Sequence, residues 1–178
     1  MKRAVFIIAS ILWIGCKENA PNTQFLGMVN LEVTGNAKAV PHFERGLLLL
    51  HSFEYQDARE AFRKAQEIDP QMPMAYWGEA MTYNHSLWHE QDYEDGAEVL
   101  KKLEAIDLEK NATALERDFI SAVKILFKPE TEKQTRDVAY SNFMEGLSQK
   151  YPDNHEVAAF YALSLLGAVP DGRDDELY

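Results

Sequence analysis

The spacing of apolar residues constrains the fold of this chain more than any other feature. From Asn36 onward these residues recur every three or four positions, which is the period of amphipathic helices that turn one face to a core. Prolines follow several of the runs, and proline lacks the amide hydrogen that a continuing helix needs. The capping-box spacing occurs at Thr113 with Glu116 and at Asp153 with Glu156, which marks two helix starts. The sequence therefore predicts an all-α domain of short helices.

The predicted helices have similar lengths and short connections. They span residues 40–53, 56–68, 73–86, 91–106, 113–127, 131–150 and 154–167. Before them, residues 28–33 alternate apolar and polar side chains and are predicted to be extended. Strand content inside the helical part should be negligible. Successive helices of this kind call for a test of internal periodicity.

The test for repeats succeeds first in residues 39–72. Their small, aromatic and turn-forming residues stand at characteristic steps: Gly46, Ala58, Phe62, Ala65 and Pro70. This pattern resembles the tetratricopeptide repeat, a hairpin of two helices. The resemblance implies that Gly46 and Ala58 lie where the helices cross, that Phe62 fills the gap between repeats, and that Pro70 ends the second helix.

Further units follow at the expected period. Pro73 stands 34 residues after Ala39 and opens a unit with Tyr76, Ala80 and Tyr83 at the aromatic and small positions. A third unit is more degenerate, and a fourth, from residue 153, is half present. The resemblance implies a right-handed solenoid of antiparallel helix pairs, about three and a half repeats over residues 39–169. Short segments such as residues 43–46 and 75–78 also resemble a group of bacterial tetratricopeptide proteins whose biochemical role is not settled.

The first fifteen residues read as a signal peptide. Lys2 and Arg3 form a short basic start, and residues 4–14 are an apolar run too short to span a bilayer. The end of the run, Ile14-Gly15-Cys16, resembles the lipobox of bacterial lipoproteins, which implies cleavage before Cys16 and lipidation of its thiol. The alternative is an ordinary signal peptide with an accidental cysteine.

Lipidation of Cys16 would make residues 16–38 a tether. We therefore expect an exported protein that is lipid-anchored to a bacterial membrane, inner or outer, with its folded part in the periplasm or outside the cell. Residues 170–178 are polar and charged, and form either a tail or a truncation point. A longer protein is favoured because solenoids usually end in a helix with a polar outer face.

Charge and motifs exclude several functions. The formal net charge of -11 disfavours nucleic acid as a partner. A single cysteine, Cys16, excludes an intramolecular disulfide or a cysteine-based metal cluster. No glycine-rich phosphate loop or nucleophile elbow is present, so no catalytic residue and no cofactor is predicted. His85 and His89 have a chelating spacing but no third ligand, so no metal site is predicted.

A concave groove is the predicted binding site. In this repeat family the first helices line the inner wall, and peptides commonly lie there. The residues predicted to line the groove are Phe43, Leu47, His51, Trp77, Met81, His85, Phe119 and Tyr161. Their character suits a protein or peptide partner, either an extended peptide or an amphipathic helix. The same spacing is also that of residues packed in a core. Phe43 and Leu47 stand where some relatives carry Lys and Asn, so no carboxylate clamp is expected.

The leading function is thus a membrane-anchored scaffold that binds a protein partner at the cell envelope. Two alternatives stay open. One is a solute- or glycan-binding lipoprotein, in which Trp77, Trp88, Tyr83 and Tyr93 stack on sugar rings. The other is the N-terminal helical part of a longer protein.

Overall fold

The computed structural model describes residues 26–169, so the predicted signal peptide, Cys16 and residues 170–178 lie outside the described residues. In chain order its elements are α1 (Val40–His51), α2 (Tyr55–Ile68), α3 (Pro73–Met81), β1 (Asn84–His85), the 3-10 turn η1 (Ser86–Trp88), β2 (Glu90–Gln91), α4 (Tyr93–Leu103), α5 (Leu108–Asn111), α6 (Ala114–Leu126), α7 (Lys133–Lys150) and α8 (His155–Ala168).

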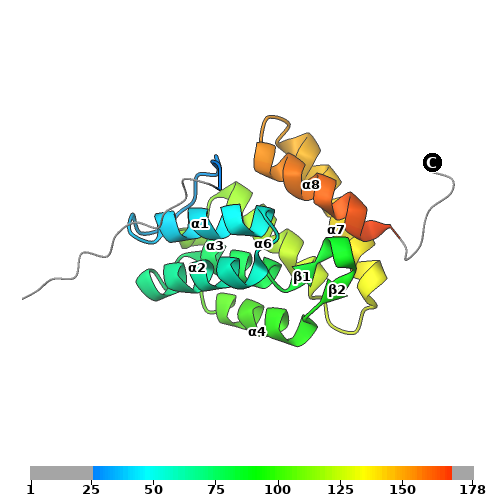
Figure 1. Ribbon diagram of the computed structural model, residues 1–178, viewed down its shortest axis with the longest axis horizontal. Helices are drawn as coiled ribbons and strands as arrows, with labels where there is room; N and C mark the ends of the chain where they lie inside the picture. Colours follow the sequence, from blue (N-terminus) through cyan, green and yellow to red (C-terminus); the bar gives the residue numbers. More distant parts are fainter. Residues whose placement is uncertain (1–25, 170–178) are drawn as a thin grey trace, which may run out of the picture.

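The long helices pack in pairs that follow one another along the chain (Figure 1). Helix α1 packs on α2, α3 on α4, and α6 on α7, while α3 also contacts both α1 and α6. First helices of successive pairs therefore lie beside one another, as in a helical repeat. The all-α fold predicted from the sequence is confirmed, and the right-handed sense of the solenoid stays a prediction.

The connection between α3 and α4 departs from the predicted helices. Helix α3 ends at Met81, five residues before the predicted end at 86, because the next residues pair as a short antiparallel ladder. Asn84 lies opposite Gln91 and His85 opposite Glu90. The 3-10 turn η1 closes this ladder and carries Leu87 and Trp88 to the surface. The connection thus presents two large apolar side chains.

The crossing of the first pair is built as the repeat pattern predicts. The ring of Phe62 is fully buried, and a Cβ placed on Gly46 would lie 2.8 Å from it. A Cβ on Gly78 would lie closer still, 2.3 Å from the same ring. Phe62 therefore packs between α1 and α3, against glycines on both sides. Gly78 stands two residues before Ala80, which the sequence analysis had assigned as the small residue of the second unit.

The two predicted capping boxes have different outcomes. The one at Thr113 is confirmed: its hydroxyl accepts from the Glu116 amide at 3.2 Å, and its own amide donates to the Glu116 carboxylate at 2.6 Å. The one at Asp153 is wrong. Asn154 caps α8 instead, because its side-chain oxygen accepts from the Val157 amide at 2.9 Å. Glu156 is then free to contact another helix.

Thr113→Ala tests the confirmed cap. The variant should lose about 1 kcal/mol of stability, because the Glu116 amide loses the Thr113 hydroxyl as its acceptor at the start of α6. Urea unfolding followed by circular dichroism measures this loss. Thr135→Ala, an exposed position on α7, is the control and should change stability by less than about 0.5 kcal/mol. Equal effects of both variants would contradict the capping role.

The segment before α1 belongs to the folded part from about residue 31. Leu31 is buried in the core, and Thr34 donates from its amide and its hydroxyl to the Glu116 carboxylate, at 2.6 and 2.8 Å. Residues 16–38 were predicted to form a lipidated tether and an extended segment. The end of that extended segment packs on the repeat domain.

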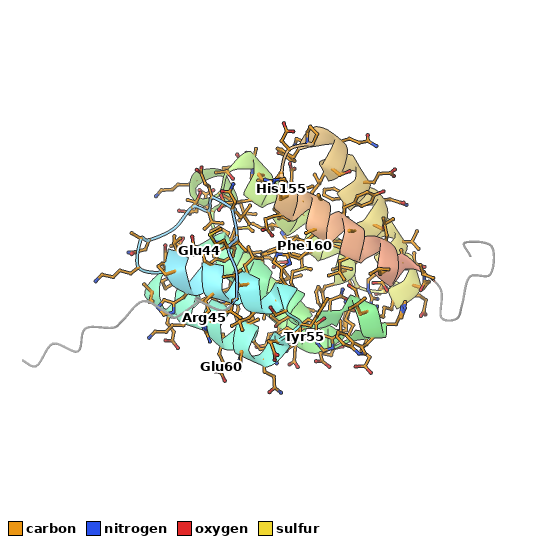
Figure 2. The ribbon with its side chains drawn as sticks, turned by 45° about the horizontal axis from the view of Figure 1, so that its top comes forward. Glu44, Arg45, Tyr55, Glu60, His155 and Phe160 are labelled. Carbon is orange, nitrogen blue, oxygen red and sulfur yellow. The ribbon has the colours of Figure 1, made fainter. Side chains whose placement is uncertain are left out.

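Helix α8 closes one side of the structure. It packs on α7 and on η1, and its Phe160 reaches the first helices of the earlier pairs. Figure 2 shows Phe160 on the side of α8 that faces α1. A regular solenoid would leave this inner wall open to a partner. Here the wall is covered by the chain's own last described helix.

Candidate functional site

The predicted groove residues fall into two groups. Phe43, Leu47, Trp77, Met81 and Phe119 are buried, with at most 4% of any of them exposed. They pack inside the fold and do not line an open groove. The expectation of an open groove at these five residues is corrected by the structure, because α8 and the neighbouring helices cover them.

Phe160 is the side chain through which α8 covers the wall. Its ring centroid lies 5.2 Å from that of Trp77 and 5.9 Å from that of Phe119, both in edge-to-face arrangements. The His51 ring lies 5.2 Å away on the other side. Such contacts are the favoured geometry for aromatic rings and stabilise the pair beyond the burial of area alone. Helix α8 thus occupies the wall as a bound helix would.

The other three predicted residues lie nearer the surface. His51, at the end of α1, contacts the Glu156 carboxylate of α8 through Nε2 at 2.7 Å. The His85 ring stacks on Tyr55 at 4.2 Å between centroids, and its Nε2 donates to the Thr82 carbonyl oxygen at 3.1 Å. Tyr161 is partly buried on α8. His51 and His85 therefore both have protein partners.

A small pocket remains where α8 meets the ends of α1 and α3. Its volume is about 140 Å³. Its walls come from α1, the turn after it, α2, α3, β1 and α8: Leu50, His51, Phe53, Tyr55, Met81, Asn84, Ala159, Phe160 and Leu163. Only His51 and Met81 among the predicted groove residues contribute to it. The pocket is what α8 leaves uncovered of the predicted groove.

Four rings pack together at the edge of this pocket, and we call them the aromatic rim: Phe53, Tyr55, His85 and Trp88. The Trp88 ring lies 5.6 Å from Phe53 and 6.1 Å from Tyr55, nearly perpendicular to both. Despite these contacts, Trp88 is 54% exposed and Phe53 37% exposed. The rim is therefore held by its own packing while two of its rings face solvent.

Two residues of these turns have a left-handed backbone. Phe53 has φ 60° and His89, next to Trp88, has φ 54°. This conformation disfavours residues with a side chain, and for a bulky residue it is a true outlier. At Phe53 this conformation ends α1, since the amides of Phe53 and Glu54 donate to the carbonyl oxygens of Leu50 and Leu49.

Sequence reasoning missed Phe53 and Tyr55 as site residues. Phe53 lies in the turn after α1, inside the range 40–53 that was predicted to be helical, and Tyr55 is the first residue of α2. A usable signal was the presence of Phe53, Leu87 and Trp88 in connections, because large apolar residues in loops seldom serve the core.

Burial raises the pKa of Tyr55 to about 12. The folded state therefore keeps its proton where the unfolded chain has lost it, above pH 10, so stability should fall as pH rises from about 10 to 12. A pH titration of tyrosine absorbance should show a late-ionising group that Tyr55→Phe removes. Tyr161→Phe, on the partly buried ring of α8, is the control and should leave that group in place. If Tyr55→Phe kept every late-ionising group of the unchanged protein, the burial of the Tyr55 hydroxyl would be contradicted.

Carboxylates surround the rim. Glu54, Asp57 and Glu90 are exposed and lie within two residues of Phe53, Tyr55 and Trp88 respectively. The segments 50–58 and 83–92 that carry the rim contain no lysine or arginine. The site is therefore an apolar patch on an acidic background.

The structure bears on the other sequence hypotheses. Trp77 and Tyr83 are buried, and Tyr93 packs on Phe127, so of the four proposed sugar-stacking rings Trp88 is the exposed one. Within residues 26–169, no group of three or more His, Cys, Asp or Glu side chains is placed to hold a metal ion. In the same range no helix has the length and apolar character needed to cross a membrane.

Comparison with known proteins identifies the repeat. A family model described as tetratricopeptide repeat matches residues 39–72, which comprise α1, α2 and the connection to α3. Neither a search of curated proteins nor a search of solved structures gives a significant match. The matched range has the boundaries predicted for the first unit, and the Phe62 crossing described above lies inside it. With this match and its paired helices, the chain contains a tetratricopeptide repeat at residues 39–72 within an all-α fold.

Proposed function

We propose that this protein is a lipid-anchored scaffold of the bacterial cell envelope that binds a protein partner at the aromatic rim. Tetratricopeptide repeats are in general scaffolds for protein interaction, which supports binding and gives no reason to propose catalysis. The finer proposal rests mainly on one observation: Phe53, Leu87 and Trp88 are exposed together beside a pocket. Exposed apolar clusters of this kind mark interaction surfaces.

The rim replaces the inner wall as the proposed site because α8 already covers that wall. A partner could reach Trp77 or Phe119 only after α8 had been displaced, and their burial opposes this. The rim needs no such rearrangement. Its rings already face solvent, and tryptophan is the residue most enriched among interface positions with large binding energies.

Capture of partners with variants tests the binding site. The full chain, expressed in its native host with an affinity tag, is cross-linked and its partners are identified by mass spectrometry. We expect Trp88→Ala to lose a partner that the unchanged protein retains. Val138→Ala, which removes an exposed apolar side chain from α7, is the matched control and should retain it. Identical partner sets for all three proteins would contradict a site at the rim.

The anchor is supported by the lipobox-like sequence at Ile14-Gly15-Cys16 and by the apolar run before it. Cells fed an alkyne-tagged fatty acid test this part separately. The full chain should carry the tag and sediment with membranes, and Cys16→Ala should do neither. An unlabelled full chain would contradict lipidation and leave the rim experiment unaffected.

A further inference from the structure

The pocket beside the rim is small, and two of its polar wall residues, His51 and Asn84, already have partners. Pockets for drug-sized molecules measure about 300–1,000 Å³, whereas this one holds about 140 Å³. Asn84 donates to Ser86 at 3.0 Å and accepts from Gln91 at 3.0 Å, while His51 contacts Glu156. These groups need no hydrogen bond from a ligand, so the chemistry that suits the pocket is one apolar group.

The walls of the pocket provide the contacts that such a group would make. Leu50, Met81, Phe160 and Leu163 line it with apolar atoms. Trp88 and Phe53 extend the apolar surface outward at its edge. A side chain that enters would be enclosed by the protein, and the backbone that carries it would lie over the exposed rings. This is the arrangement of an anchor residue surrounded by a rim that excludes water.

The surface around the pocket selects the charge of the partner. Glu54, Asp57 and Glu90 are exposed near the rim. Arg59, which follows the first rim segment, is engaged by Thr82 and lies over the Tyr83 ring. An acidic partner segment would be repelled, whereas lysine or arginine beside the anchor would be attracted. The formal net charge of the whole chain, -11, also favours a basic partner over an acidic one.

We infer that the partner presents a basic segment with one large apolar side chain, and that this side chain enters the pocket between α8 and the aromatic rim. The inference deepens the proposed function and rests on it. It names the chemistry of the partner: an apolar anchor flanked by lysine or arginine.

Peptide binding to the purified full chain tests this inference. The probe is a fluorescein-labelled peptide of twelve residues with a central tryptophan flanked by two lysines on each side. Fluorescence anisotropy at low salt should give saturable binding. A peptide with alanine for tryptophan should bind at least tenfold more weakly, as should one with glutamate for lysine. Added salt should weaken binding of the first peptide, because exposed charges are screened.

Variants of α8 locate the anchor. Ala159 and the adjacent Ala158 are both exposed, and of the two Ala159 lines the pocket. Ala159→Leu should fill the pocket and weaken peptide binding at least tenfold, whereas Ala158→Leu should leave binding unchanged. Circular dichroism confirms that both variants are folded. Equal binding by both variants, or equal binding of the tryptophan and alanine peptides, would overturn the inference.

The outcome separates the inference from the proposed function. If Trp88→Ala loses its cellular partner while the basic peptide fails to bind, the rim is an interaction site and the predicted partner chemistry is wrong. If the peptide binds as expected but no cellular partner depends on Trp88, the pocket is correctly described and the scaffold role at the rim is contradicted.

Discussion

Phe62→Ala should lower the free energy of unfolding by about 3–5 kcal/mol, because the variant leaves a cavity at the crossing of two repeats. The Phe62 ring is fully buried and lies 5.6 Å from that of Phe43. Few neighbours can move into the space, since the ring packs against backbone at Gly46 and Gly78. Urea unfolding measures the loss. A loss below about 1 kcal/mol would contradict the packing.

A double variant makes this test specific to the crossing. Gly78→Ala should be strongly destabilising alone, because its Cβ would lie 2.3 Å from the Phe62 ring. In a Phe62→Ala background the cavity accepts the added methyl group, so the same change should cost much less. Additive effects of the two substitutions would show that they do not share a contact.

Phe160→Ala should have the second large effect, again about 3–5 kcal/mol if α8 stays cooperative with the rest of the fold. Its ring contacts Trp77, Phe119 and His51, so its loss removes the aromatic contacts between α8 and the inner wall. Hydrogen exchange read by mass spectrometry should show faster exchange in α8, with α1 and α2 less affected. The exchange pattern distinguishes local release of α8 from general destabilisation.

Leu166→Ala is the matched control on the same helix. Leu166 is 53% exposed, so its loss should change stability by no more than about 0.5 kcal/mol. Exchange in α8 should then resemble that of the unchanged protein. Similar effects of Phe160→Ala and Leu166→Ala would contradict the burial of Phe160 against the wall.

The first repeat could be predicted from sequence because its signals are local. Gly46, Phe62 and Pro70 stand at fixed steps, and each has a distinct physical role in a helical hairpin. The role of Gly78 escaped prediction because it stands outside the usual small position of its unit. Close approach to Phe62 depends on how two repeats stack, which the pattern within one repeat does not report.

The site was harder to predict because the covering of the first helices by α8 depends on tertiary packing. Periodicity predicts that Phe43, Trp77 and Phe119 face one side of the first helices, but it could not show that Phe160 of α8 covers Trp77 and Phe119. A signal did exist. Helix α8 carries apolar residues on several sides, among them Phe160 and Leu166, and a helix of that kind usually packs on more than one side.

Three rings of the aromatic rim lie in the connections after α1 and α3, and the fourth, Tyr55, begins α2. Phe53 follows α1, and Trp88 lies in a turn that replaced the predicted end of the third helix. Their proximity depends on the two turns meeting in space at a ring distance of 5.6 Å. The sequence analysis named Trp88 for a different reason, sugar stacking, and did not connect it with Phe53.

A double-mutant cycle between Trp77 and Phe160 tests most directly whether α8 occupies the inner wall. Stability is measured for Trp77→Leu, Phe160→Leu and the double variant. The centroids of the two rings lie 5.2 Å apart. This contact predicts that the sum of the two single-variant stability losses exceeds the loss in the double variant by at least about 0.5 kcal/mol. Losses that simply add would mean that the two rings do not touch, and that the wall is open to a partner after all.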